Sequence, residues 1–186
     1  MKIATILPYK ENFSHEYAGA VSIFINAITK KSIYKNDITI YGSTKYKNKL
    51  SKNYINIPLA KKLLKSQSKD YVEKFKALHS QKKAEIIEIH NRPNYIKHLI
   101  SLSTKLILYF HNDPLTMDGS STINERIYLL NSCERIVFNS EWSKKQFLKK
   151  LPQFYHKSKK FNVIHQSVSQ KKINLKKKKK IITFVG

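Results

Sequence analysis

The chain has 186 residues, one cysteine and a formal net charge of +24, which suit one domain with a sizeable core and at most two domains. The single cysteine, Cys133, excludes an internal disulfide and fits a reducing compartment. No window approaches the ~18 apolar residues of a membrane-spanning helix, and Pro8 and Lys10 interrupt the first apolar run, as in a strand rather than a signal peptide. We therefore expect a cytoplasmic protein.

Lysine supplies nearly all of the positive charge, because only three of the 36 basic residues are arginines. Specific readers of phosphate groups and bases favour arginine for its planar fork. A lysine excess spread along the whole chain is therefore weak support for nucleic acid, and no specific nucleic-acid partner is predicted. The alternatives that stay open are compositional bias, attraction to an anionic membrane surface and non-specific attraction to nucleic acid.

Short apolar runs alternate with stretches of helical periodicity. The apolar runs predict strands at residues 2–7, 37–41, 54–57, 85–90, 106–110, 135–138 and 161–164. The helical spacing predicts helices at residues 18–30, 59–64, 69–81, 93–102, 123–132 and 140–150. Thr122 with Glu125 has the pattern of a capping box, and Ser140 is the expected cap of the last helix. This alternation is typical of an α/β fold, a Rossmann-like parallel sheet with helices on both faces.

The fifth predicted strand ends where chemistry is expected. It is an unbroken apolar run, which indicates burial on both faces, and it stops at His111, Asn112 and Asp113. The strand before it also ends in a histidine and an asparagine, His90 and Asn91. Ligands of open α/β sheets bind beyond the carboxyl ends of the strands. A single histidine at a strand end is often structural, but two at equivalent positions favour a functional site.

Two further connections carry weaker signals. Gly19 and Ala20 open the first helix, where backbone N–H groups and the helix dipole favour an anion, although close helix–sheet packing explains the glycine equally well. The motif is not GxGxxG, which disfavours a nicotinamide or flavin dinucleotide. Asn139 and Ser140 follow the sixth strand, and helix capping by Ser140 accounts for much of that signal.

Several reaction classes lack their motifs. There is no HExxH or CxxC, so the sequence specifies no metal site and no cofactor, and there is no GxSxG elbow or P-loop. Five consecutive lysines at 176–180 lack interleaved aromatic residues, so they indicate a solvated linker rather than a nucleic-acid motif.

These motifs together resemble a known family. In chain order they are KIATILPY, IEIHNRP, LILYFHND, RIVFNSEWSKKQF, FNVIHQSVS and IITFVG. This order resembles the N-terminal domain of a GT-B glycosyltransferase of the family 4 type, over nearly the whole chain and most specifically over 85–147. The resemblance implies one half of a GT-B fold, with an acceptor-side domain at 1–170 and a lysine-rich linker at 171–180. Residues 181–186 would then be the first strand of a C-terminal domain, so we expect a chain truncated before that domain.

The resemblance also implies roles for residues. His111 would be the catalytic residue that contacts the reacting sugar. Donor or acceptor binding is implied for Gly19, Ala20, Arg92, Asn112, Asp113, Asn139, Ser140 and Gly186. The sequence departs from the family where Ala20 replaces a second glycine, and where Gln166-Ser167-Val168-Ser169 replaces the usual Asn-Gly-Val-Asp.

The implied function is retaining transfer of a sugar from a nucleotide-sugar donor to a lipid-linked or cell-envelope saccharide, at the inner face of the membrane. Because most of the donor site would lie in the second domain, we expect this fragment to be inactive. The competing hypothesis is a non-catalytic, Rossmann-like basic module that binds anionic membrane or polymer, and it rests on the net charge of +24.

Overall fold

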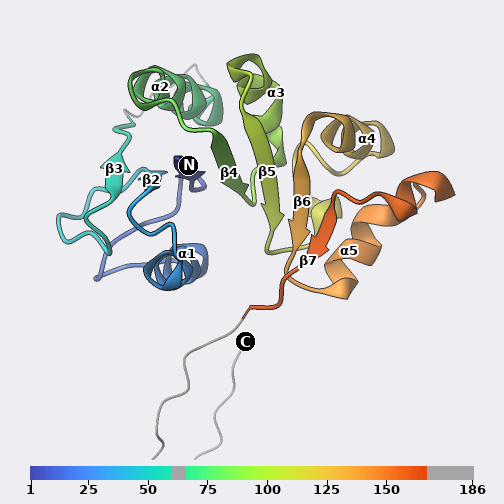
Figure 1. Ribbon diagram of the computed structural model, residues 1–186, viewed down its shortest axis with the longest axis horizontal. Coiled ribbons are helices and arrows are strands. Elements are labelled where there is room, and N and C mark those ends of the chain that lie inside the picture. Colours follow the sequence, from blue (N-terminus) through green and yellow to red (C-terminus); the bar gives the residue numbers. More distant parts are fainter. Residues whose placement is uncertain (60–65, 167–186) are drawn as a thin grey trace, which may run out of the picture.

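Seven parallel strands form one sheet in the computed structural model, which describes residues 1–59 and 66–166 (Figure 1). The order across the sheet is β3-β2-β1-β4-β5-β6-β7. Strands β2 and β3 are therefore added on one side of β1, and β4 to β7 are added on the other side, so the strand order reverses between β1 and β4. The strands are β1 (Ile3–Ile6), β2 (Ile38–Gly42), β3 (Tyr54–Asn56), β4 (Ile86–His90), β5 (Lys105–Phe110), β6 (Arg135–Phe138) and β7 (Phe161–Val163). The predicted Rossmann-like sheet is confirmed, and its reversal point lies beside β4.

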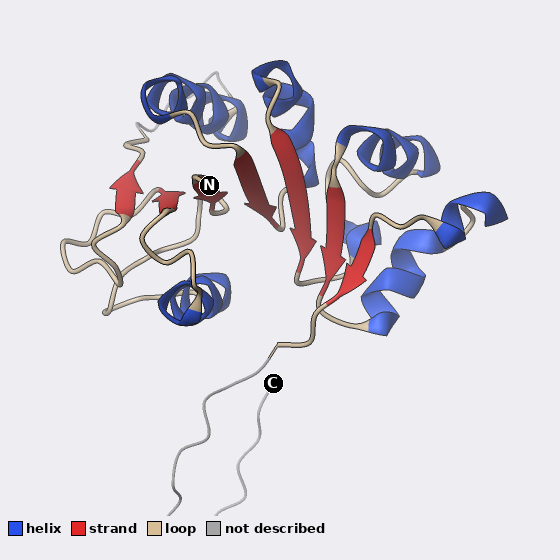
Figure 2. Ribbon diagram, in the orientation of Figure 1, coloured by secondary structure: helices blue, strands red, loops and turns tan. Residues whose placement is uncertain are grey.

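Helices cover both faces of the sheet, as predicted. One helix packs on one side of the sheet and the others pack on the opposite side, as their buried residues show, and helices on both sides are visible in Figure 2. The helices are α1 (Ala20–Lys31), α2 (Gln67–Lys82), α3 (Ile96–Leu99), α4 (Ile123–Ser132) and α5 (Glu141–Leu148). The isolated helix is α1. Strand residues therefore alternate between a small core under α1 and a large core under α2–α5.

Three predicted helices differ from the observed ones. The helix predicted at 93–102 is divided into a 3₁₀ turn, the single turn α3 and a second 3₁₀ turn. The helix predicted to reach residue 150 ends at Leu148, and Lys150 then adopts a left-handed φ of 62°, which continues no helix. The helix predicted at 59–64 lies outside the described residues, except for Leu59, which is not helical.

The burial of β5 explains its place in the centre of the sheet. Leu106, Leu108 and Phe110 are at most 2% exposed and pack in the core under α2–α5. On the opposite face Tyr109 is 8% exposed and Ile107 is half-buried. The strand is therefore buried on both faces only toward its carboxyl end, which is where the candidate site begins.

Both predicted helix caps are present. The Thr122 hydroxyl accepts a hydrogen bond from the Glu125 N–H at 3.2 Å, and the Glu125 carboxylate accepts one from the Thr122 N–H at 2.9 Å. The Ser140 hydroxyl accepts from the Ser143 N–H at 3.2 Å at the start of α5. These caps satisfy N–H groups that have no partner inside the helix.

A buried arginine on α4 connects the segment before α4 with the residue that follows α5. Arg126 is 2% exposed and donates to the carbonyl oxygens of Ser120 and Ser121, at 3.2 and 2.9 Å, and of Lys149, at 2.8 Å. A guanidinium can donate to three carbonyl oxygens at once, because its five N–H groups point in different directions within one plane. One of the three arginines is therefore structural.

We expect Arg126→Met to lower the free energy of unfolding by about 3 kcal/mol, because three carbonyl oxygens lose their donor. Urea unfolding followed by circular dichroism measures this change. Arg135→Met is the matched control, since Arg135 is exposed and bonds only to Glu134; its cost should stay under about 0.5 kcal/mol. Equal losses in the two variants would contradict the structural role of Arg126.

Candidate functional site

Two histidines meet at the carboxyl edge of the sheet. His90 ends β4, His111 directly follows β5, and the two strands pair in parallel with His90 opposite Tyr109. The Nδ1 atom of His90 lies 2.8 Å from Nε2 of His111, and the side chains are buried, with residue exposures of 1% and 9%. The structure thus brings the two predicted strand-end histidines into direct contact.

The histidine pair belongs to a longer polar path. At one end, the Glu88 carboxylate accepts a hydrogen bond from the Thr5 hydroxyl at 3.1 Å and lies 3.9 Å from Nε2 of His90. At the other end, the Gln166 amide nitrogen lies 2.7 Å from Nδ1 of His111. The path therefore runs from Glu88 through both imidazoles to Gln166, and it draws on β4, β5 and the segment after β7.

One arrangement of protons satisfies the contacts from Gln166 to His90 with both rings neutral. The Gln166 amide donates to Nδ1 of His111, and the Nε2–H of His111 donates to Nδ1 of His90. The Nε2–H of His90 makes no hydrogen bond within the described residues, and the Glu88 carboxylate lies 3.9 Å from this nitrogen. All three N–H groups are oriented in one direction, toward the negative charge of Glu88.

The ionisation of the site agrees with this arrangement. Burial, together with the neighbouring His90, lowers the pKa of His111 from 6.5 to about 3. Burial on its own raises the pKa of Glu88, but the neighbouring His90 and the hydrogen bond from Thr5 outweigh it, so that the pKa falls below 4.5. At neutral pH the site therefore holds a neutral His111 and an ionised Glu88.

Aromatic rings fix the plane of the His111 imidazole. Tyr109 stacks on His111 at 4.6 Å between ring centroids, and it also stacks on His90 at 5.2 Å. Phe24 of α1 meets His111 edge-on at 5.1 Å. The Tyr109 hydroxyl donates to the carbonyl oxygen of Ile164 at 3.1 Å, which ties the rings to the segment after β7.

Two asparagines hold the backbone of His111. The Asn91 side-chain oxygen accepts from the His111 N–H, and the Asn139 amide donates to the His111 carbonyl oxygen, both at 2.7 Å. Asn91 has a left-handed φ of 52°, a conformation that asparagine tolerates better than most residues. The main chain and both ring nitrogens of His111 are therefore all engaged.

The start of α1 already holds an anionic group. The Glu11 carboxylate accepts a hydrogen bond from the Ser22 N–H at 3.0 Å, in the first turn of α1. A Cβ atom on Gly19 would lie only 2.1 Å from that carboxylate, so glycine at position 19 leaves room for Glu11. A phosphate group can approach the N–H groups near Gly19 and Ala20 only if the Glu11 side chain moves aside.

The comparisons with known proteins bear on the fold. No protein-family model matches the sequence, and no curated protein matches it. Solved structures do match. Sucrose-phosphate synthase from Thermosynechococcus elongatus is 14% identical with a TM-score of 0.57, over 88% of this chain and 47% of that chain. HepE from Anabaena, in complex with UDP-glucose, is 12% identical with a TM-score of 0.55, over 90% of this chain and 44% of that chain.

A third match is MurG from Acinetobacter baumannii, 8% identical with a TM-score of 0.51, over 92% of this chain and 47% of that chain. The Rossmann-like sheet of this chain therefore has the fold of one half of the GT-B structures that it matches. The chain spans about half the length of each of these three structures. At such low identity the likeness establishes the fold alone.

The remaining predicted site residues lie at the carboxyl edge of the sheet and differ in how far their polar groups are already hydrogen-bonded. Asn139 accepts from the Ser143 hydroxyl at 2.9 Å through its side-chain oxygen, and Ser140 caps α5, so both are occupied structurally. Asp113 accepts from the Leu115 N–H at 3.0 Å and caps a 3₁₀ turn. These three polar side chains therefore organise the edge of the sheet in this structure.

Two other predicted residues keep donor groups available. Asn112 is exposed, and Arg92 is half-buried with Nη1 donating to the Asn91 carbonyl oxygen at 2.7 Å. Gly186 lies outside the described residues. Gln166 and Glu88 were not predicted as site residues, because the motifs in which they stand do not indicate a contact with the two histidines. The only signal for Asn91 was the repeated His-Asn pair.

Within residues 1–59 and 66–166, no group of three or more His, Cys, Asp or Glu side chains is placed to hold a metal ion. None of the helices there has the length and apolar character needed to cross a bilayer.

Acidification should destabilise the protein through His111. Its pKa of about 3 in the folded state lies below its usual 6.5, so the unfolded chain binds the proton first as the pH falls. The stabilisation that the neutral His111 provides is complete above pH 6.5, its pKa in the unfolded chain, and is lost progressively at lower pH. Between about pH 7.5 and pH 5 the loss should be about 2 kcal/mol. Glu88 contributes only at lower pH, because its pKa is already lowered.

Urea unfolding at both pH values, for the wild type and His111→Gln, isolates this contribution. The buried His79, whose pKa burial also lowers, is present in both proteins and cancels in the comparison. The variant should lose about 2 kcal/mol less than the wild type on acidification. Parallel pH dependences would show that His111 is not held neutral.

A double-mutant cycle tests the contact between Gly19 and Glu11. Gly19 has a φ of −77°, which alanine adopts without strain, so its only conflict is with the Glu11 carboxylate. Gly19→Ala should therefore cost at least about 1 kcal/mol in the wild type and nothing in the Glu11→Ala background. Thermal unfolding of the four proteins measures the coupling. Additive effects would rule out this contact.

Proposed function

We propose that this chain supplies the acceptor-side half of a glycosyltransferase of the family 4 type. The complete enzyme transfers a sugar, with retention of configuration, from a nucleotide-sugar donor to a lipid-linked or cell-envelope saccharide. The observation that supports this most directly is the neutral, buried His111 at the carboxyl edge, beside the point where strand order reverses. The UDP-glucose complex of HepE, a protein with the same fold, supports a nucleotide-sugar as the donor.

The proposed role of His111 is to contact the reacting sugar. Its Nδ1 atom is bonded to Gln166, an exposed side chain that a sugar hydroxyl can replace. A neutral imidazole can bind a hydroxyl as donor or acceptor without the cost of burying a charge. Positive charge that develops at the reacting centre would be stabilised through His90 by the ionised Glu88.

Arg92 and Asn112 supply the remaining contacts of the proposal. The guanidinium of Arg92 uses one donor on the Asn91 carbonyl oxygen and has others for an anionic acceptor group. Asn112 is exposed beside His111 and suits a sugar hydroxyl. The nucleotide-sugar is a substrate in this scheme, and we assign no cofactor or metal ion.

A second Rossmann-like domain, on the same or another polypeptide, would hold most of the donor. Three of the solved structures that match are about twice the length of this chain, which supports a two-domain enzyme. We place the enzyme in the cytoplasm, at the inner face of the membrane, where a lipid-linked acceptor is accessible. The competing basic-module hypothesis rests on net charge and leaves the buried path from Glu88 to Gln166 without a purpose.

The test is release of nucleoside diphosphate from UDP-, GDP- and ADP-sugars in the presence of saccharide acceptors. Residues 1–186 alone should release no more than a blank, because most of the donor site is supplied elsewhere. The two-domain enzyme should release it, and His111→Ala should lower kcat about 100-fold with a smaller change in KM.

Two results would contradict the proposal. Turnover by residues 1–186 alone would show that no second domain is needed. Unchanged kcat in a folded His111→Ala enzyme would show that this histidine has no part in the reaction.

A further inference from the structure

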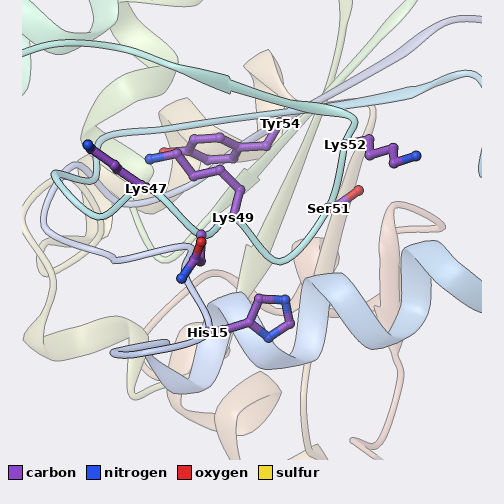
Figure 3. Close-up of a pocket in the computed structure, with 7 residues that line it drawn as sticks. His15, Lys47, Lys49, Ser51, Lys52 and Tyr54 are labelled. Atoms are coloured by element: carbon purple, nitrogen blue, oxygen red, sulfur yellow. The ribbon is translucent and has the colours of Figure 1, made fainter.

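A second candidate site lies away from the histidines. A cavity of about 610 Å³ opens between the β1–α1 connection and the β2–β3 connection (Figure 3). It shares no residue with the path from Glu88 to Gln166. Its walls include His15, Lys47, Lys49, Ser51, Lys52 and Tyr54. Nothing in the proposed transfer reaction uses these residues.

The two connections are tied together, so the cavity has fixed walls. Ser14 and Lys49 form an antiparallel bridge, and the His15 N–H donates to the Asn48 carbonyl oxygen at 3.0 Å. Tyr54 lines the cavity, and Phe13 stacks on it at 4.9 Å between ring centroids, with the ring planes 4° apart. We call this stacked pair the floor of the cavity. Phe13 is fully buried, which anchors this floor to the core under α1.

The cavity lining is basic and contains no carboxylate. Lys49 donates to the Tyr46 carbonyl oxygen, so its ammonium group is fixed above the floor. Lys47 and Lys52 are exposed, and neither makes a hydrogen bond or ion pair with the described part of the chain. The neighbouring Glu16 accepts a hydrogen bond from Asn48 instead of pairing with these lysines.

The arrangement of charge indicates the shape of the ligand. Figure 3 shows Lys47 and Lys52 on opposite sides of the cavity, with their side chains extending outward from its rim, Lys49 and Tyr54 between them and His15 across from these two. Ammonium groups that are spread along a cavity suit anionic groups spaced along an extended ligand. A single phosphate would instead require donors that converge on one point. The volume falls in the range of small-ligand pockets, which span about 300–1,000 Å³.

The uncharged groups of the lining favour a saccharide. The Ser51 hydroxyl accepts from the Asn53 N–H and keeps its own O–H donor, and the Asn48 amide donates to Glu16 and keeps its side-chain oxygen, so both retain groups of the kind that bind sugar hydroxyls. A nucleobase requires an open aromatic face. One face of Tyr54 is taken by Phe13, and the Lys49 ammonium lies 5.5 Å from its ring centroid. Stacking of a base would displace one of these contacts.

We propose that this cavity binds an acidic saccharide, through carboxylate or phosphate groups spaced along the sugar chain. Lys47 and Lys52 contact the acidic groups, and Ser51 and Asn48 contact hydroxyls. The assignment of this saccharide as the acceptor rests on the proposed function. The binding itself does not, because it requires neither a donor nor a second domain.

The experiment is calorimetric titration of the chain with tetragalacturonate at about 0.15 M salt, with maltotetraose as the neutral counterpart. Lys47→Gln/Lys52→Gln should weaken tetragalacturonate binding about tenfold, since two charge contacts are lost. Lys157→Gln/Lys159→Gln removes the same charge from exposed residues elsewhere and should change binding less than about twofold.

A footprint on the wild-type protein provides a second measurement that needs no variant. Tetragalacturonate should protect Lys47 and Lys52 from acetylation, read by mass spectrometry, and leave Lys157 and Lys159 unprotected. Equal weakening by both double variants would mean bulk charge attraction and would overturn the proposal. So would binding of maltotetraose with the same affinity, or no protection of Lys47 and Lys52.

Parallel titrations separate the competing ligands and the two proposals. Tighter binding to phosphatidylglycerol vesicles, to single-stranded oligothymidylate or to pyrophosphate, lost in the Lys47/Lys52 variant, would replace the saccharide with that ligand. If the cavity binds the saccharide but a two-domain enzyme releases no nucleotide, the saccharide site is supported and the proposed function is refuted. If the enzyme releases nucleotide but the cavity binds no saccharide, the proposed function is supported and the saccharide site is refuted.

Discussion

The hydrogen bond between His90 and His111 constrains the whole carboxyl edge of the sheet. Two imidazoles buried side by side cannot both carry charge, and each buried ring nitrogen needs a partner. The 2.8 Å contact satisfies one nitrogen of each ring, and Gln166 satisfies the outer nitrogen of His111, whereas Glu88 lies 3.9 Å from the outer nitrogen of His90. The parallel register of β4 and β5 sets the offset between the two rings. A shift of one residue would send the His90 side chain to the other face.

The surroundings of His111 leave it little freedom. Its N–H, its carbonyl oxygen and both ring nitrogens have partners, drawn from three separate strand ends. Rings from β5 and α1 confine the plane of the imidazole. Such a group is already oriented before a ligand arrives, and preorganisation of this kind is what stabilises a transition state without reorganisation. Gln166 is the exception, because it is exposed and is the one partner that a substrate can displace.

Features set by local sequence were predictable. The capping box at Thr122 and the cap at Ser140 depend on residues three positions apart, and both are confirmed. The meeting of His90 and His111 was also accessible, since parallel strands end at the same edge. The contact of Gln166 was not, because its partner lies 55 residues away and the motif that contains Gln166 does not indicate that partner. The short helical turns after β4 were missed because their apolar spacing resembles that of a longer helix.

The start of α1 shows why a local motif can have two meanings. A glycine before a helix suggested a site for an external anion, and an anionic group is indeed present, but it belongs to Glu11. The dipole and the free N–H groups attract negative charge whatever its source. A chain with a net charge of +24 thus places one of its few carboxylates where a phosphate would otherwise bind. Positive charge without a hydrogen bond or ion pair to residues 1–59 and 66–166 is found instead at Lys47 and Lys52, between β2 and β3. In the two proposals, His111 therefore binds its ligand through neutral hydrogen bonds, and Lys47 and Lys52 bind theirs through charge.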